Sequence, residues 1–354
     1  MKNITLFLSL FCFLGIHAQT EYHEASAFTL LGKATQETET LYERLPAKYH
    51  DVSRPELWYL GKNTAGLAVR FTSNSTSISL RWESLNNYHM DHMTDVGVKG
   101  LDLYCLSQGK WRFVNSARPQ GKQSEYRLIE NMELKERNYM LYLPLYDGIS
   151  SLQIGVDSLS YIRPSDKEVV RADKPVGFYG TSILQGGCAS RPGMASTNIL
   201  SRWLNRECIN LGFSGNAFLD YEIAELMSAV DAAAYVLDFV PNVTEEQIET
   251  KMETFYKILR DRHAEVPVFF VEDPMFTHAD YDRVIFDKVT GLNRKLKKVF
   301  HSLVEKGEKN IHYVSSEKLI GADREGTVDG IHATDLGMLR YAELMYPLLK
   351  RNLK

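Results

Sequence analysis

The chain is 354 residues long, which is more than one ordinary core accommodates, so two domains are expected. Its content of 44% hydrophobic and 24% charged residues is that of a folded protein and excludes extensive disorder. The net charge of -4 argues against a nucleic-acid or anionic-membrane partner, because either would require a basic face.

Residues 1–18 have the pattern of a signal peptide. A positive start, MKN, precedes the apolar run ITLFLSLFCFLGI, and a small-residue site follows that ends near Ala18. The run is short for a membrane span and no stop-transfer pattern follows, so an uncleaved anchor is the weaker alternative. Cys12 lies inside the apolar run and not at the cleavage site, which argues against a lipid anchor. We expect a mature chain that begins near Gln19 and is periplasmic or secreted.

The other cysteines do not organise the fold. Cys105, Cys188 and Cys208 are odd in number and have no CxxC spacing, which disfavours a disulfide framework or a zinc site. One alternative is a single disulfide bridge with a spare thiol. The favoured alternative is that all three thiols are buried and pack as small hydrophobic groups.

Residues 19–165 predict an antiparallel β-sandwich of jelly-roll type. Segments 67–85, 100–117 and 137–162 alternate polar and apolar residues and are interrupted by short turns. Three tryptophans of this region suit core positions of the sandwich at least as well as a platform for stacking sugars: Trp58, Trp82 and Trp111.

Residues 175–354 predict a doubly wound α/β domain, joined to the sandwich by a polar linker at 166–174. Short apolar runs typical of buried parallel strands alternate with helical segments. The runs are VGFYG, ECINLGF, AAYVLDFV, VPVFFVED and NIHYVSS. Thr244 is expected to cap the helix that follows the third run.

The first of these strands ends by presenting a serine, Ser182, in the stretch GFYGTSILQGG. The carboxyl edge of such a sheet is where α/β folds bind their ligands, although a tight turn that merely needs room explains the small residues as well. A nucleophilic serine also needs a base, a group that orients the base, and donors for an oxyanion.

A histidine with its own carboxylate follows the last strand, in TVDGIHATDLGM. Asp329 lies three residues before His332, so the carboxylate could hold Nδ1–H while Nε2 faces Ser182. The alternative is an ordinary polar loop in which Thr334 or Asp335 caps the last helix.

Two further loops supply candidate oxyanion donors. Gly215 follows the second strand and offers a backbone N–H, and Asn242 follows the third strand and offers a side-chain amide. Each loop alone is ordinary turn chemistry, but all four segments follow strands of one sheet at one edge. Chance is therefore the poorer explanation.

The four segments resemble the four blocks of the SGNH (GDSL-like) hydrolase superfamily. Ser182, Gly215, Asn242 and His332 match the blocks in order, with Asp329 as the triad acid. The stretch HMTDVGVKGLDLY is similar to the N-terminal β-sandwich of a secreted bacterial branch, so the resemblance covers nearly the whole mature chain. The first block reads Gly-Thr-Ser here and the third reads Val-Pro-Asn-Val, which alters the bracing of those loops but keeps the catalytic side chains.

The resemblance implies a flavodoxin-like three-layer α/β/α domain and ester hydrolysis through an acyl-enzyme on Ser182. His332 would act as base and then as acid, and the N–H groups of Ser182 and Gly215 with the Asn242 amide would hold the oxyanion; no metal or cofactor is required. The expected substrate is a small acyl ester, acetyl above all, on a small molecule or an oligosaccharide. A lipase-like or thioester hydrolase is the alternative, and a carbohydrate-binding protein with an inactive scaffold is the rival of another class.

Other polar residues are assigned lesser roles. His89 and His92 form an HxxH pair that is a weak metal signal, and their loop is expected to lean over the active site, with His92 in the substrate pocket. Arg191 is expected either to meet the substrate or to form a salt bridge between the domains. Glu272 and Asp273 are adjacent on a strand and point to opposite faces, which disfavours a glycosidase carboxylate pair.

Overall fold

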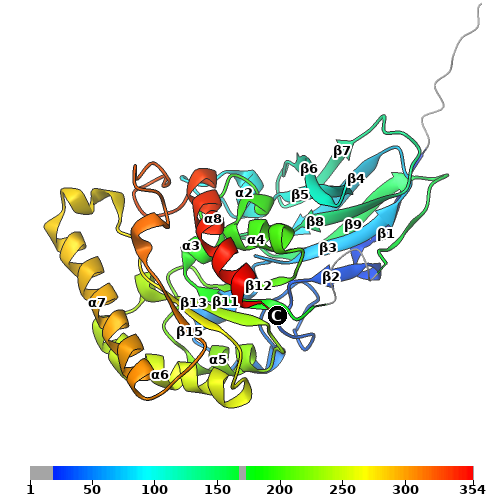
Figure 1. The fold of residues 1–354 in the computed structure, drawn as a ribbon. Coiled ribbons are helices and arrows are strands. Elements are labelled where there is room, and N and C mark those ends of the chain that lie inside the picture. The colour runs from blue at the N-terminus through cyan, green and yellow to red at the C-terminus, as the bar shows by residue number, and fades with distance from the viewer. Residues whose placement is uncertain (1–18, 167–172, 354) are drawn as a thin grey trace, which may run out of the picture.

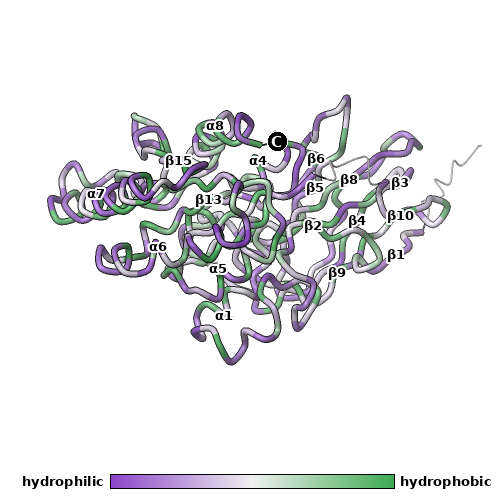
Figure 2. Tube along the Cα trace, turned by 60° about the horizontal axis from the view of Figure 1, so that its bottom comes forward, coloured by the Kyte–Doolittle hydropathy of each residue, from purple (hydrophilic) through white to green (hydrophobic). Residues whose placement is uncertain are grey.

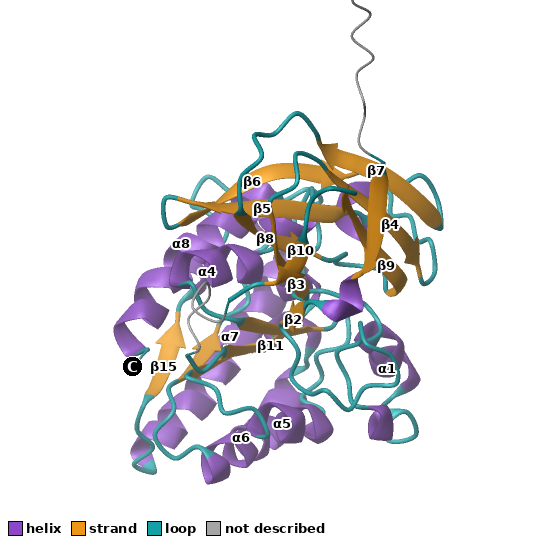
Figure 3. Ribbon diagram, turned by 90° about the vertical axis from the view of Figure 1, so that its right-hand side faces the viewer, coloured by secondary structure: helices purple, strands orange, loops and turns teal. Residues whose placement is uncertain are grey.

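The computed structural model describes residues 19–166 and 173–353. The predicted signal peptide and most of the predicted linker lie outside the described residues. Two antiparallel sheets occupy the N-terminal part, and one parallel sheet flanked by helices occupies the C-terminal part (Figures 1 and 3). Within the part of the chain that the structure describes, no helix is long and apolar enough to cross a bilayer.

The N-terminal sheets pack face to face around a shared core. One has the strand order β1-β9-β4-β7; the other has the order β10-β3-β8-β5-β6, with β2 paired to β3. Residues of both sheets, among them Phe71 of β3 and Trp82 of β4, meet in one buried cluster. The elements are β1 (Thr20–Glu24), β2 (Thr29–Leu31), α1 (Pro55–Gly61), β3 (Ala68–Ser73), β4 (Ile78–Ser84), α2 (Asp95–Lys99), β5 (Leu101–Ser107), β6 (Lys110–Ala117), β7 (Gln123–Ile129), β8 (Arg137–Tyr142), β9 (Ile149–Asp157) and β10 (Ile162–Pro164).

The C-terminal part is a doubly wound parallel sheet, as the sequence predicts. Its strand order is β12-β11-β13-β14-β15, and every pairing is parallel. The chain therefore changes winding direction beside β11, the position at which such sheets bind ligands. The elements are β11 (Val176–Gly180), α3 (Ser182–Gln185), α4 (Ser196–Leu204), β12 (Cys208–Gly212), α5 (Tyr221–Ser228), β13 (Ala234–Asp238), α6 (Glu245–Arg262), β14 (Val268–Val271), α7 (Arg283–Glu305), β15 (Ile311–Val314) and α8 (Asp335–Asn352).

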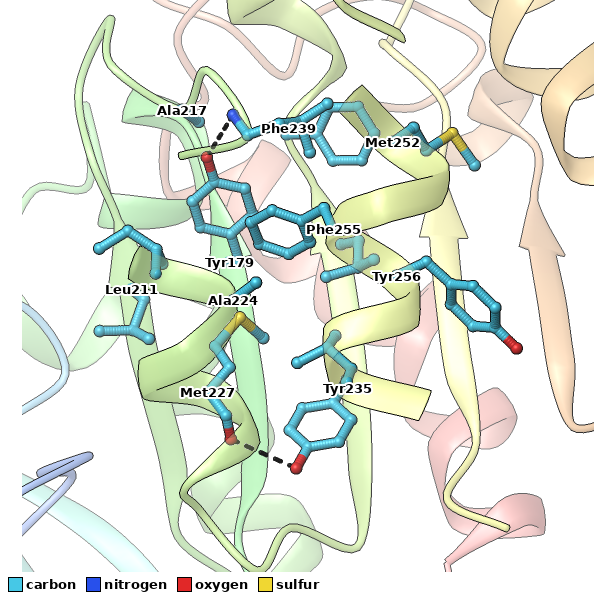
Figure 4. Packing of buried hydrophobic residues seen from close by; sticks show 14 of the residues in the cluster. Tyr179, Leu211, Ala217, Ala224, Met227, Tyr235, Phe239, Met252, Phe255 and Tyr256 are labelled. Atoms are coloured by element: carbon cyan, nitrogen blue, oxygen red, sulfur yellow. Dashed lines mark hydrogen bonds between the residues drawn. The ribbon is translucent and has the colours of Figure 1, made fainter. Parts of the chain in front are cut away.

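Helices cover both faces of this sheet, which gives a three-layer, flavodoxin-like domain. α4 and α8 pack on one face, and α5, α6 and α7 pack on the other (Figure 1). Tyr179 of β11 stacks on Phe255 of α6 with 4.9 Å between ring centroids, and its hydroxyl accepts a hydrogen bond from the Leu219 N–H (Figure 4). Thr244 caps α6 through a capping box, as expected. Along α7, hydrophobic and hydrophilic stretches alternate, as a helix with one buried face requires (Figure 2).

The segment between β2 and β3 packs against the C-terminal domain. Trp58 of α1 lies in the same buried cluster as Tyr179 and Ile223, so the prediction that it belongs to the sandwich core is wrong. Arg44, 1% exposed, donates from Nη1 to the carbonyls of Asn210 (3.1 Å) and Gly212 (2.8 Å) at the end of β12. This segment, which lies between two strands of the sandwich in the chain, therefore connects the two domains by direct contacts.

Candidate active site

Ser182 lies at the carboxyl end of β11, where the strand turns directly into the short helix α3. Thr181 caps this helix, and its hydroxyl accepts from the Ile183 N–H at 3.3 Å. Gly180 has no room for a side chain, since a Cβ there would lie 2.4 Å from the Asp238 carbonyl oxygen of β13. The tight turn holds Ser182 at the sheet edge, with only 7% of its surface exposed.

The loop after β15 brings a histidine and a carboxylate to this serine. His332 Nε2 lies 3.0 Å from Ser182 Oγ, and His332 Nδ1 lies 2.6 Å from Asp329 Oδ2. The other carboxylate oxygen accepts from the backbone N–H groups of Ile331 (2.9 Å) and His332 (2.7 Å). Hydroxyl, imidazole and carboxylate thus form one continuous chain along which a proton can leave Ser182.

The carboxylate of this chain is held ionised. Partial burial acts to raise the pKa of Asp329, but the hydrogen bonds from the His332 side chain and from the backbone of His332 and Ile331 outweigh it and lower the pKa to about 2. An ionised Asp329 accepts the Nδ1 proton and leaves the Nε2 lone pair directed at Ser182.

The two predicted oxyanion loops are joined by a hydrogen bond. The Asn242 Oδ1 atom accepts from the Ala217 N–H at 3.2 Å, which leaves the amide NH₂ free to point elsewhere. Gly215 adopts a positive φ of 65°, a conformation that favours glycine. The N–H of the neighbouring Ser214 donates to Gln185 Oε1 at 2.9 Å, so the glycine loop is also tied to the helix of Ser182.

The sandwich domain contributes a loop to the site, at residues 85–94. The His92 ring meets the His332 ring edge to face with 5.4 Å between centroids, and its Nδ1 lies 2.9 Å from Asp91 Oδ1. The other histidine of the HxxH pair turns away from this site: His89 Nδ1 binds Asp95, and its Nε2 lies 3.0 Å from the Lys99 ammonium.

A buried carboxylate anchors this loop. Asp147, fully buried, accepts from the backbone N–H groups of Asn86 and Tyr88, both at 3.0 Å. The adjacent Tyr146 donates its hydroxyl to the backbone carbonyl of Ser182 at 3.1 Å. One turn of the sandwich therefore positions both the covering loop and the serine.

Arg191 lies in the domain interface. Its Nη1 atom is 2.7 Å from Asp102 Oδ2 and 2.8 Å from the Tyr104 hydroxyl, and the Gly193 N–H donates to the same Asp102 oxygen at 2.8 Å. Two roles were expected for Arg191, and the structure shows the salt bridge between the domains. Asp102 and Tyr104 belong to the stretch GLDLY, and this ion pair gives that stretch a structural purpose.

The Arg191→Met variant is expected to lose about 3–5 kcal/mol of stability, because it leaves the fully buried Asp102 carboxylate without its cationic partner. Burial raises the pKa of Asp102, and the Arg191 guanidinium opposes that rise. Thermal unfolding followed by circular dichroism measures the loss. Arg112→Met, on the exposed face of β6, is the control and should unfold like wild type. An unchanged midpoint for Arg191→Met would contradict the prediction, and Asp102→Asn added to it should restore part of the loss.

Two further carboxyl groups are buried at the same sheet edge. Burial raises the pKa of Asp238 to about 7, although a hydrogen bond of 2.9 Å from the Tyr341 hydroxyl opposes the rise. Burial, and then the nearby charge of Asp238, raise the pKa of Asp273 well above its usual range. Neither group belongs to the chain of Ser182, His332 and Asp329.

The Asp238→Asn variant is expected to be more stable than wild type at about pH 9, but not at about pH 4. The pKa of Asp238 is higher in the folded state than in the unfolded state, so between these two values the folded state binds more protons. Wild-type stability therefore falls as pH rises through this range and is lowest above about pH 7. The gain at high pH should reach on the order of 2–4 kcal/mol. Urea unfolding at the two pH values measures it. An equal effect at both pH values would contradict the prediction.

Sequence reasoning missed two residues at this site. Cys188 is buried in a hydrophobic cluster, as predicted, but its sulfur also lies within 4.8 Å of a ring nitrogen of both His92 and His332, which was not predicted. Its position six residues after Ser182 was the available signal. Tyr146 had no local signal, because its contact with Ser182 joins two domains. Cys105, Cys188 and Cys208 all carry free thiols.

Comparison with known proteins agrees with this arrangement. Residues 173–350 match the model of the GDSL-like lipase/acylhydrolase family, and residues 20–162 match a model described as the N-terminus of SGNH-hydrolase-type esterases. No curated protein matches the chain.

Three solved structures illustrate the similarity. A Bacteroides ovatus protein described as a GDSL-like lipase is 36% identical, with a TM-score of 0.90 over 95% of this chain and 99% of its own. The salicylyl-acyltransferase SsfX3 of a tetracycline biosynthetic pathway is 17% identical, with a TM-score of 0.78 over 95% and 99%. An acetyl xylan esterase of the rumen bacterium Butyrivibrio proteoclasticus is 13% identical, with a TM-score of 0.57 over 94% and 98%. The last two show similarity of fold alone.

The fold and the family match define an ester-cleaving hydrolase built on a flavodoxin-like sheet. The chain belongs to the GDSL-like lipase/acylhydrolase family and carries the N-terminal domain of SGNH-type esterases.

Proposed function

We propose that the protein is an exported serine esterase that removes short acyl groups, acetyl above all, from carbohydrate. The observation that carries the catalytic part is the hydrogen-bonded chain from Ser182 Oγ through His332 to the Asp329 carboxylate, at 3.0 and 2.6 Å. These are the distances that general-base activation of a serine requires.

The reaction proceeds in two halves. Ser182 Oγ attacks the ester carbonyl carbon while His332 Nε2 takes its proton, and the imidazolium then protonates the leaving alcohol as the C–O bond breaks. His332 next removes a proton from water, which attacks the acyl-enzyme and releases the acid. The N–H groups of Ser182 and Gly215 and the Asn242 amide are the proposed donors to the oxyanion, and each such donor is typically worth about 3 kcal/mol of barrier.

The substrate assignment rests on the surroundings of Ser182. The His92 ring, from the loop at residues 85–94, contacts the His332 ring with 5.4 Å between centroids, and a covered site of this kind favours a small acyl group. The similarity of fold to an acetyl xylan esterase supports acetyl and carbohydrate. Export is supported by the signal-peptide pattern of residues 1–18, and mass spectrometry of the secreted chain should find its start near Gln19.

Hydrolysis of p-nitrophenyl acetate, butyrate and octanoate tests the acyl preference. We expect kcat/KM to be highest for acetate, and we expect a fluorophosphonate probe to label the wild type but not Ser182→Ala. Release of acetate from acetylated xylo-oligosaccharides then tests the carbohydrate part.

Each other outcome favours a different function. Preference for octanoate would favour a lipase-like enzyme, as in the description of the Bacteroides ovatus relative. Turnover of p-nitrophenyl acetate without release of acetate from sugars would remove carbohydrate as the substrate. Absence of both turnover and labelling would favour a binding protein built on the hydrolase fold.

A further inference from the structure

A thiol and two imidazoles converge beside Ser182. One ligand atom each of His92, Cys188 and His332 lies within 4.8 Å of the other two. Zn²⁺ binds such nitrogen and sulfur ligands at 2.0–2.3 Å, which places the ligand atoms about 3.5 Å apart. A side-chain shift of roughly 1 Å closes the difference. His92 has room for it, since 28% of its side chain is exposed.

Both histidines are oriented as metal ligands are. His332 Nδ1 lies 2.6 Å from Asp329, and His92 Nδ1 lies 2.9 Å from Asp91, so Nε2 is the nitrogen that each ring offers to a metal. On His332 the metal would replace the Ser182 hydroxyl, which lies 3.0 Å from Nε2. A carboxylate on the far nitrogen is the usual support of a zinc-bound histidine, because it fixes the tautomer and makes the ring a better donor.

The local charge also suits a cation. The carboxylates of Asp329 and Asp91, which bind the Nδ1 atoms of His332 and His92, bring negative charge to this cluster. Two carboxylates attract a dication, and a bound metal ion takes a cysteine as its thiolate. Arg191 does not neutralise this negative charge, because its guanidinium is bound to Asp102.

We propose that His92, Cys188 and His332 form an inhibitory site for a soft divalent cation, of which Zn²⁺ is the fitting example. Binding forms bonds from the metal to two Nε2 atoms and to Cys188 Sγ, and the thiol proton passes to solvent. His332 Nε2 then holds the metal and not the Ser182 hydroxyl proton, so the esterase stops. The inhibition rests on the proposed catalytic role of His332, whereas the binding does not.

Calorimetry with zinc chloride on the Ser182→Ala variant tests the binding, because this measurement does not require catalytic activity. We expect one Zn²⁺ per chain, release of close to one proton, and a dissociation constant at least about 10–100-fold higher when Cys188→Ala is added. Cobalt(II) should give a thiolate charge-transfer band that Cys188→Ala removes. In the wild type, zinc should inhibit hydrolysis of p-nitrophenyl acetate, and magnesium should not.

Cys105→Ala is the matched control, because it removes a free thiol from β5, outside the cluster, and should leave zinc binding unchanged. Cys188→Ser serves as a second variant should the alanine variant fail to fold. Zinc affinity that is equal in wild type and both Cys188 variants, or the absence of a thiolate band in the cobalt-loaded wild type, would overturn the site. Tight zinc binding without inhibition would overturn the inhibitory role alone.

Discussion

The Ser182→Ala variant is expected to lose about 10⁵–10⁶-fold in kcat on p-nitrophenyl acetate, because it removes the proposed nucleophile, the Ser182 hydroxyl oxygen. The oxyanion donors remain, so a small residual rate above that of water is expected. Initial rates under saturating substrate measure the loss, with enzyme prepared free of other esterases.

The fold of this variant should be unchanged, because the Ser182 hydroxyl makes its hydrogen bond to His332 and fills little space. Ser201→Ala is the matched control: its hydroxyl donates to the Arg206 carbonyl at 2.7 Å within the helical layer and takes no part in the site. This control should keep wild-type activity and labelling by fluorophosphonate. A Ser182→Ala variant within tenfold of wild type would contradict the assignment of the nucleophile.

The parallel sheet was predictable because its signal is local. Runs such as VGFYG become strands with every residue buried, and buried parallel strands need apolar side chains on both faces. Once the strands were placed, their shared direction put the segments of Ser182 and His332 at one edge. The structure places the two side chains 3.0 Å apart at that edge.

The contacts between domains were not predictable in the same way. Trp58 lies on α1 in the N-terminal segment, and its buried partners, such as Tyr179, show that it packs with the other domain. Arg191 and Asp102 are far apart in the sequence, so the alternatives for Arg191 stayed open until the structure paired them. A local pattern reports that a side chain is buried or charged, but not which distant element covers it.

The replacement of Asp329 by asparagine is expected to lower kcat by about 10⁴-fold with little change in KM. An asparagine can present its NH₂ group to His332 Nδ1, which then carries no proton, and the proton moves to Nε2. A protonated Nε2 cannot accept the proton of Ser182, although the geometry is kept. Because hydrogen bonds from His332 and Ile331 hold the pKa of the carboxyl at about 2, wild-type Asp329 stays ionised at any ordinary assay pH. Titration of this carboxyl therefore makes no contribution to the wild-type rate between about pH 6 and about pH 8.

Asp323→Asn is the control for this prediction, because Asp323 lies in the same loop but pairs with Arg340 at 2.6 Å, away from His332. It should retain wild-type kcat. A loss of less than tenfold in Asp329→Asn would mean that the tautomer of His332 is fixed by something other than this carboxylate. Since Asp329 also accepts two backbone N–H groups, Asp329→Ala should cost stability in addition, as it leaves the N–H groups of Ile331 and His332 without their acceptor. A stability loss in the alanine variant together with a kcat loss in both variants would separate the two tasks of this side chain, which are to hold the loop and to set the proton on His332.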